Sequence, residues 1–290
     1  MIWTILPGTQ AIIGGEDKEW NRFGFLVKIF SREKLSNIVT SCTGTIISPR
    51  LVLTSSQCIL NTTTGKRLSE FVINAPFMKG SRILGAEVVK IGETWAIMEI
   101  PELKLSMLCP PAPAPRGVAQ LNVRPTLLQS SIVSIDPLKL KRKKCWVVGF
   151  ATTDNATEFV DQNNIRLIAL KSLDAVKNKP NFLWSPIVAN DTACWDDVGA
   201  ALFCSTRAWG HMLVGIFQHL IAPSQLQKTT NGGEEINITS SCNGAVEMRF
   251  SKIADQFKLF EAIQNFDITS FVSVYQHCFR DVPYSLTPGM

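Results

Sequence analysis

The sequence lacks the features that mark several large classes of protein. It has no apolar run of about 18 residues or more, which a transmembrane helix requires, so we expect no membrane anchor. It has no CxxC pair, no HxxxH spacing and no glycine-rich phosphate loop, so we expect no metal, nucleotide or other cofactor. The net charge of +5 is modest and locally concentrated, which argues against nucleic acid as a partner. Histidine is scarce, with only His211, His219 and His277 in the chain.

What the sequence does contain is many apolar residues in short β-rich runs. Of the 290 residues, 46% are hydrophobic, enough for one substantial core in a single all-β domain or in two subdomains. The runs include "FGFLVKIF", "GTIISPRLVL", "CWVVGF" and "MLVGIF", bounded by glycine, proline, asparagine or charged residues. This spacing is typical of β-sandwiches and barrels rather than of βαβ units.

Two segments indicate where the chain divides. "CPPAPAPRG", from Cys109 to Gly117, predicts an extended connector because proline fixes φ and removes a hydrogen-bond donor. We therefore expect a boundary near residue 118. "SKIADQFKLFEAI" has apolar residues at helical spacing and predicts a terminal helix at about 251–264. This helix either packs onto the second half of the chain or binds a partner by itself.

Eight cysteines, an even number spread along the chain, predict disulfides formed in an oxidising compartment. Four Asn-x-Ser/Thr sequences point the same way, since N-glycosylation belongs to the secretory pathway and to surface loops. Their asparagines are Asn61, Asn155, Asn190 and Asn237. We therefore expect a secreted, extracellular protein, with residues 1–11 as a leader or residual propeptide.

Three landmarks then occur in order along the chain: "IIGG", "SCTGTIISPRLVLTSSQC", and "CWDDVGAALFC" followed by "MLVGIF". With cysteines at matching places, they resemble the trypsin/chymotrypsin-like serine protease family from residue 12 to about residue 263. The resemblance implies an all-β fold of two antiparallel six-stranded barrels, a cleft between them and a C-terminal helix. The implied divisions are barrel one at about 12–117, barrel two at about 118–250, the helix within a domain of 12–264, and a tail at 265–290.

The resemblance also implies how the cysteines pair. The implied disulfides are Cys42 with Cys58, Cys145 with Cys204, and Cys194 with Cys242. Cys109 and Cys278 are then left over. We expect them to pair and to hold the tail across the back of the domain.

The resemblance places the three catalytic positions on residues that cannot perform the family's chemistry. In that chemistry a serine attacks, a histidine moves the proton and an aspartate orients the histidine. Gln57 stands at the histidine position, Thr94 at the aspartate position and Val198 at the serine position, so base, charge and nucleophile are all missing. No histidine precedes His211 to replace the base. Asp196 replaces the glycine of the oxyanion hole, where a carboxylate opposes the developing negative charge.

Other positions of the family are retained or altered around the activation site. Asp197 matches the aspartate that, in active relatives, pairs with a freed N-terminal amine, here that of Ile12. Ala11 replaces the basic residue at which activating proteases cut, so ordinary activation is not expected, although signal-peptidase cleavage after Ala11 would also free Ile12. Without a cut, Asp197 should stay solvated or find another donor, because an unpaired buried charge is costly.

The substrate pocket is altered as well. Thr192 falls at its base and offers no carboxylate to select lysine or arginine, while Gln218, His219 and Leu220 replace its usual wall. The pocket is either filled by neighbours such as Trp195 or left open. An extended peptide could still pair with the backbone of the wall.

These residues predict a non-catalytic trypsin-like homologue that binds extracellular proteins, namely proteases, inhibitors or receptors. It would act as a decoy, cofactor or regulator of proteolysis. An alternative is an adhesive or polyanion-binding protein that uses the basic run at 139–144. A remote alternative is a residual hydrolase with Ser55 or Ser56 as nucleophile and His219 as base.

Overall fold

A computed structural model gives the arrangement of most of the β-rich runs. It describes residues 4–5, 12–19, 23, 25–34, 38–48, 50–75, 82–83, 85–103, 144–150, 164–177, 179–189, 191–206, 210–223, 238–239, 242–253, 258–259, 261–263 and 265. Several predicted features lie outside these residues: Cys109, Cys278, Asn155, Asn190, Asn237, the basic run apart from Lys144, and the tail beyond residue 265. For them the statements above stay predictions.

The first sheet is built from the N-terminal half of the chain. Its strands are β1 (Thr4–Ile5), β3 (Leu26–Arg32), β4 (Ile38–Ser48), β5 (Leu51–Thr54), β6 (Glu70–Asn74), β7 (Arg82–Ile83), β8 (Glu87–Ile91) and β9 (Ala96–Glu99). They run in the order β7-β6-β3-β4-β5-β9-β8, with β1 added beside β4. All the pairs are antiparallel except β1 with β4.

The second sheet is built from the C-terminal half and one early strand. Its strands are β2 (Glu16–Glu19), β10 (Cys145–Phe150), β11 (Asn164–Ala169), β12 (Asp174–Val176), β13 (Lys179–Pro186), β14 (Ala201–Thr206), β15 (Gly210–Ile221), β16 (Ile238–Thr239) and β17 (Glu247–Lys252). The order is β12-β13-β17-β15-β14-β10-β11-β2, with β16 beside β15. Since β2 pairs with β11, residues 16–19 belong to this sheet. The predicted division had placed them in barrel one.

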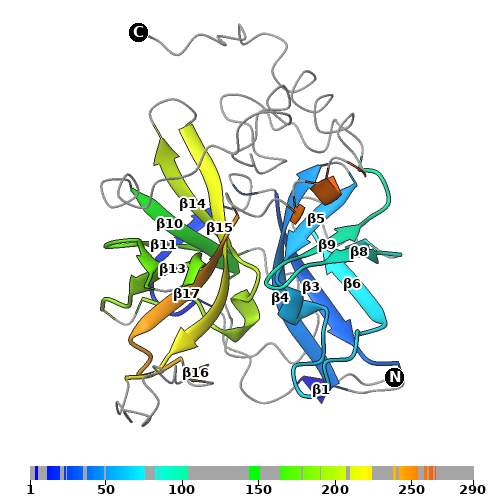
Figure 1. The fold of residues 1–290 in the computed structure, drawn as a ribbon, viewed down its shortest axis with the longest axis horizontal. Helices are drawn as coiled ribbons and strands as arrows, with labels where there is room; N and C mark the ends of the chain where they lie inside the picture. Colours follow the sequence, from blue (N-terminus) through cyan, green and yellow to red (C-terminus); the bar gives the residue numbers. More distant parts are fainter. Residues whose placement is uncertain are drawn as a thin grey trace, which may run out of the picture.

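β7 and β8 are the two end strands of the first sheet, yet they follow each other closely in the chain, so this sheet curls back on itself. In the second sheet, β12 lies at one end and β11 lies next to the other end, and β12 follows β11 closely in the chain. The predicted all-β, trypsin-like fold with two antiparallel sheets is confirmed. Within the described residues the sheets contain eight and nine strands rather than six, because short strands are added: β1 and β7 in one sheet, and β2, β12 and β16 in the other. The two sheets stand side by side (Figure 1).

Several strands are buried on both of their faces, as at all four residues of β5, because consecutive side chains of a strand point to opposite faces. Apolar side chains such as Ile29, Val52, Val147 and Phe250 are fully buried. After β17, residues 258–259, 261–263 and 265 are helical, with Leu259 and Ile263 buried, so a terminal helix is present where the sequence predicted one. Within the described ranges, no helix combines the length and apolar character needed to cross a bilayer.

Disulfides connect segments that the sheets already bring together. The bridges are Cys42 with Cys58, Cys145 with Cys204, and Cys194 with Cys242, the three pairs that the resemblance implied. Cys145 and Cys204 also lie opposite each other in the β10–β14 ladder. Each bridge closes a loop in the unfolded chain and so lowers its conformational entropy, which contributes about 3 to 5 kcal/mol to stability.

The two sheets are in close contact at the loop that precedes β14. This loop contains a short 3₁₀ helix, η5 (Trp195–Asp197), and the backbone N–H of Thr43 on β4 donates to Val198 O at 2.9 Å. Gly199 has φ +87°, and a Cβ there would lie 2.2 Å from Thr43 O and 2.4 Å from Thr54 Oγ1. Only glycine combines this backbone conformation with so close an approach.

The approach at Gly199 can be tested against a glycine of similar conformation. Gly244 has φ +85°, but a Cβ added there would have no atom within 4 Å, so Gly244→Ala is the matched control. We expect Gly244→Ala to lower the free energy of unfolding by about 1 to 2 kcal/mol, the cost of a left-handed alanine. Gly199→Ala should lower it by about 1 to 3 kcal/mol more, because the methyl group overlaps β4. Urea unfolding measures both, and equal losses would contradict the close packing.

Candidate functional site

Gln57 is placed by the short turn that follows β5. The turn is a 3₁₀ helix, η2 (Ser56–Cys58), and its last residue is fixed by the disulfide to Cys42. The hydroxyl of Ser55 accepts the backbone N–H of Gln57 at 3.2 Å, which caps this turn. Gln57 is therefore held within reach of β15 in the other sheet, where its Nε2 lies 3.4 Å from Gln218 Oε1.

A second glutamine, Gln218 on β15, is the centre of the polar contacts around Gln57. Its Oε1 accepts from Ser55 Oγ at 2.9 Å and from Gln57 Nε2 at 3.4 Å. Its Nε2 donates to Thr94 O at 2.9 Å. Gln218 is 1% exposed, so these bonds satisfy an amide that would otherwise be costly to bury. The sequence identified Gln218 only as part of the pocket wall.

Thr94, at the position of the family's aspartate, continues this network into the second sheet. Its side-chain oxygen lies 2.7 Å from Ser251 Oγ on β17, and both residues are buried. Ser251 carries no sequence signal, because only the pairing of the sheets brings it there. Glutamine, serine and threonine side chains do not titrate near neutral pH, so this network contains no general base.

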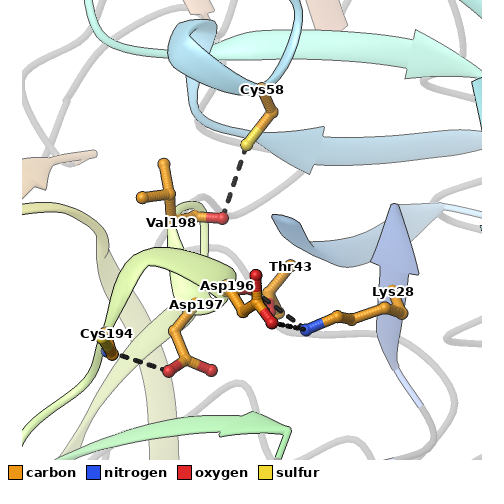
Figure 2. A network of polar contacts seen from close by, with 7 residues as sticks. All are labelled: Lys28, Thr43, Cys58, Cys194, Asp196, Asp197 and Val198. Atoms are coloured by element: carbon orange, nitrogen blue, oxygen red, sulfur yellow. Dashed lines mark hydrogen bonds and ion pairs between the residues drawn. The ribbon is translucent and has the colours of Figure 1, made fainter. Parts of the chain in front are cut away.

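The nucleophile position is occupied by Val198, which is 3% exposed. The dashed line in Figure 2 joins Cys58 Sγ to Val198 O, which are 3.4 Å apart. Because Cys58 is in a disulfide it has no S–H to donate, so this is a packing contact. The carbonyl of Val198 is instead bonded by the N–H of Thr43. The residue thus links the two sheets through its backbone, and its side chain offers no reactive atom.

Asp196, at the oxyanion-hole position, is paired with a buried lysine from the other sheet. Lys28 Nζ, on β3, lies 3.7 Å from Asp196 Oδ2 and donates to Asp196 O at 3.3 Å (Figure 2). Thr43 Oγ1 donates to the same carbonyl at 3.2 Å, and the ammonium lies 5.7 Å from the Phe150 ring centroid. The sequence missed Lys28, because a single lysine in an apolar strand usually reaches solvent.

Asp197 follows directly and is completely buried. Its Oδ2 accepts the backbone N–H of Cys194 at 2.9 Å, whereas its Oδ1 has no hydrogen-bond partner among the described residues. Burial raises the pKa of Asp197 to about 7, and the charge of Lys28 and the N–H of Cys194 oppose this rise. The carboxyl group of Asp197 thus has a hydrogen-bond donor for one of its two oxygens, and it is buried rather than solvated.

The raised pKa of Asp197 predicts a pH dependence of stability. Its ordinary pKa is 3.8, so the folded state binds the proton more tightly than the unfolded state does. The resulting stabilisation is complete below about pH 4 and is lost as the pH rises through about 7. We expect the free energy of unfolding of the wild type to fall relative to Asp197→Asn across this window, by on the order of 4 kcal/mol. Urea unfolding from pH 4 to 8 measures it, and parallel pH profiles would refute it.

The ion pair of Lys28 and Asp196 predicts a second effect on stability. Lys28→Met leaves a buried carboxylate without its cation, so we expect a loss of about 3 to 5 kcal/mol. Adding Asp196→Asn to that variant should recover most of the loss, because the buried charge is then removed. Denaturant unfolding of both single variants and the double variant gives the coupling. Additive losses would show that the pair does not interact.

The pocket base is packed with apolar side chains. Thr192 is buried, and its hydroxyl donates to Ala193 O at 2.8 Å. Met248 Sδ lies 3.5 Å from the N of Ala193, and Met248 and Leu220 face each other across β15 and β17. Both are 1% exposed. Met248 therefore lies beside the residue that follows Thr192 in the chain, and Leu220 lies beside Met248.

One residue of the predicted pocket wall, Leu220, is already paired with the chain's own strand β16. Thr239 lies opposite Leu220, and Ile238 opposite Ile221. The carbonyl of Ile221 accepts from the N–H of Val246, toward β17. Since consecutive strand residues direct their peptide groups to opposite sides, those of Leu220 face β16. An extended peptide could pair here only after displacing β16.

The remaining predicted residues do not form a second reactive centre. Ser55 is fully buried and donates its proton to Gln218, and Ser56 Oγ donates to Glu93 O at 3.0 Å, which argues against the remote hydrolase alternative. Burial lowers the pKa of His219 to about 4, with help from Arg249 and Lys179, so the ring is neutral at physiological pH. Among the described residues, no group of three or more His, Cys, Asp and Glu is placed to hold a metal ion.

Asn61 is the one predicted glycosylation site within the described residues. Its Oδ1 accepts the N–H groups of Thr63 and Thr64 at 2.9 and 3.0 Å, and its Nδ2 donates to Glu33 Oε1 at 2.7 Å. Residues 62–66, which follow it, are all exposed. The site therefore begins a surface turn.

Comparison with known proteins agrees with this fold. The family model described as Trypsin matches residues 12–230, so the chain belongs to the trypsin family. A solved structure entitled "HL collagenase" is similar to it with a TM-score of 0.58 and 10% sequence identity, covering 88% of this chain and 99% of that one. At this identity the likeness concerns the fold alone. No curated protein sequence matches the chain.

Proposed function

We propose that this chain is a secreted trypsin-family protein without protease activity, which acts by binding other extracellular proteins. The observation that carries the proposal is the hydrogen-bond network of Gln57, Gln218 and Thr94, in which every titrating group of the family's mechanism is replaced by a neutral one. Catalysis of acyl transfer needs a nucleophile, a base and donors aimed at the oxyanion. Val198 supplies no nucleophile, and Asp196 brings negative charge to the position of the oxyanion hole.

Secretion is supported by the cysteines and the sequons. Disulfides persist mainly in oxidising compartments, and the described part of the chain has three. Asn61 begins an exposed turn where a glycan would meet no packing obstacle from residues 62–66. We propose N-glycosylation there, and at the three other sequons that lie outside the described residues.

The binding role is that of a decoy, cofactor or regulator of proteolysis, working through loops on a rigid scaffold. The packing of Met248 and Leu220 and the pairing of β16 oppose the insertion of a partner's extended segment into the cleft. We therefore propose that proteases, inhibitors or receptors contact loops and outer faces of the domain. We infer this binding role by analogy with other proteins in which one fold carries many functions.

A labelling experiment tests the absence of activity. We expect purified secreted protein to show no reaction with a fluorophosphonate probe and no turnover of a peptide-substrate panel, because the described cleft presents no activated hydroxyl. Active trypsin is the positive control. The variant Gln57→His, Thr94→Asp, Asp196→Gly and Val198→Ser restores the four family residues, and it should stay inactive while Met248 and β16 fill the cleft. Labelling of the wild type that survives Val198→Ala would refute the proposal.

A further inference from the structure

The segment around Ile12 is anchored in both sheets of the uncut chain. On the N-terminal side, β1 pairs in parallel with β4, with Thr4 opposite Ile38 and Ile5 opposite Val39. On the C-terminal side, β2 pairs with β11 in the other sheet. The chain therefore passes from one sheet to the other across the site at which relatives are cut.

Ile12 and Ile13 already contact the C-terminal half of the chain, where Ile13 forms an isolated bridge with Thr192. Ile12 is 1% exposed, and its carbonyl accepts from Arg166 Nη1 at 3.5 Å. Ile13 and Thr192 exchange both backbone hydrogen bonds, at 2.9 and 3.0 Å. A Cβ on Gly149 would lie 3.2 Å from Ile12 Cδ1 and 2.4 Å from Asp197 Oδ1, so the side chains of Ile12 and Asp197 pack against the same glycine.

The turn after Ile13 requires a glycine at position 14. Gly14 has φ +70°, and a Cβ there would lie 1.9 Å from Asp191 Oδ1. That same oxygen accepts the N–H of Gly15 at 3.0 Å. A side chain at Gly14 would therefore break the contact that holds the segment next to the pocket base.

We propose that residues 12–19 and the 194–199 loop take their ordered arrangement in the uncut chain, so that the fold does not wait for cleavage before Ile12. In active relatives, as the resemblance implies, the freed amine fixes this loop. Here Lys28 brings a positive charge to the loop from β3, and the N–H of Cys194 bonds Asp197. These contacts exist while Ile12 is joined to Ala11, a residue that offers no basic cleavage signal.

A variant that can be cut on demand tests the proposal without any assay of activity. The sequence Asp-Asp-Asp-Asp-Lys is inserted between Ala11 and Ile12, where enteropeptidase cleaves it. Amide hydrogen exchange is then followed by mass spectrometry in peptides covering 12–19 and 194–199, for wild type and for the variant before and after cleavage. We expect exchange in both segments to be slow in the uncut forms and to change by less than about threefold on cleavage. Fast exchange before the cut and slowing by more than about tenfold after it would overturn the proposal.

A pair of glycine variants gives an independent test in the native sequence. Gly14→Ala should unseat the segment and speed exchange in 12–19 and 194–199 by about tenfold or more. Gly65→Ala is the matched control, because Gly65 has φ +68° with nothing within 4 Å. It should leave both segments as protected as in the wild type. If exchange in both segments is as slow in Gly14→Ala as in Gly65→Ala, the contacts of residues 12–15 do not hold the loop and the proposal fails.

Discussion

The structure of the cleft depends on how closely the 194–199 loop approaches strand β4. The carbonyl of Val198 is bonded by the N–H of Thr43, and Gly199 leaves no room for a methyl group against that strand. This contact sets two carboxylates, Asp196 and Asp197, in the interior, where charge must be compensated. Lys28 compensates it from the opposite sheet. The loop is therefore positioned by packing, backbone hydrogen bonds and one buried cation, and none of these requires a catalytic residue.

Above the loop, the chain uses its own groups for contacts that a protease would offer to a substrate. Gln218 accepts from Ser55 and Gln57 and donates to Thr94, so polar atoms in the cleft are satisfied by one another. Met248 packs beside Ala193, next to Thr192, and β16 pairs with Leu220 of the predicted pocket wall. A cleft of this kind gains stability from bonds and packing that an open active site would leave unmade, in line with the known exchange of activity for stability.

Much of this fold could be predicted from the sequence, because its landmarks are local. The segments around Cys42, Cys58 and Cys194 fix the family resemblance, and the three described disulfides follow from it. The unreactive positions Gln57, Thr94 and Val198 were also found in this way. What sequence reasoning missed depends on register and on contacts between sheets. Ser251, Met248 and Lys28 sit in ordinary β-rich runs, and nothing local distinguishes them from neighbours that point elsewhere. The extra pairing of β16 belongs to the same class, since two residues carry no strand signal.

We propose that the chain's own side chains and strand β16 occupy the place that the family uses for substrates. Titration with aprotinin, an inhibitor that inserts an extended loop into trypsin-like clefts, tests this claim most directly. Isothermal titration calorimetry should show no saturable binding up to about 100 μM, which corresponds to a binding free energy weaker than about −5.5 kcal/mol. Saturable one-to-one binding below about 1 μM that is lost with Leu220→Pro would mean that the cleft accepts a substrate-like strand, and the account would be wrong.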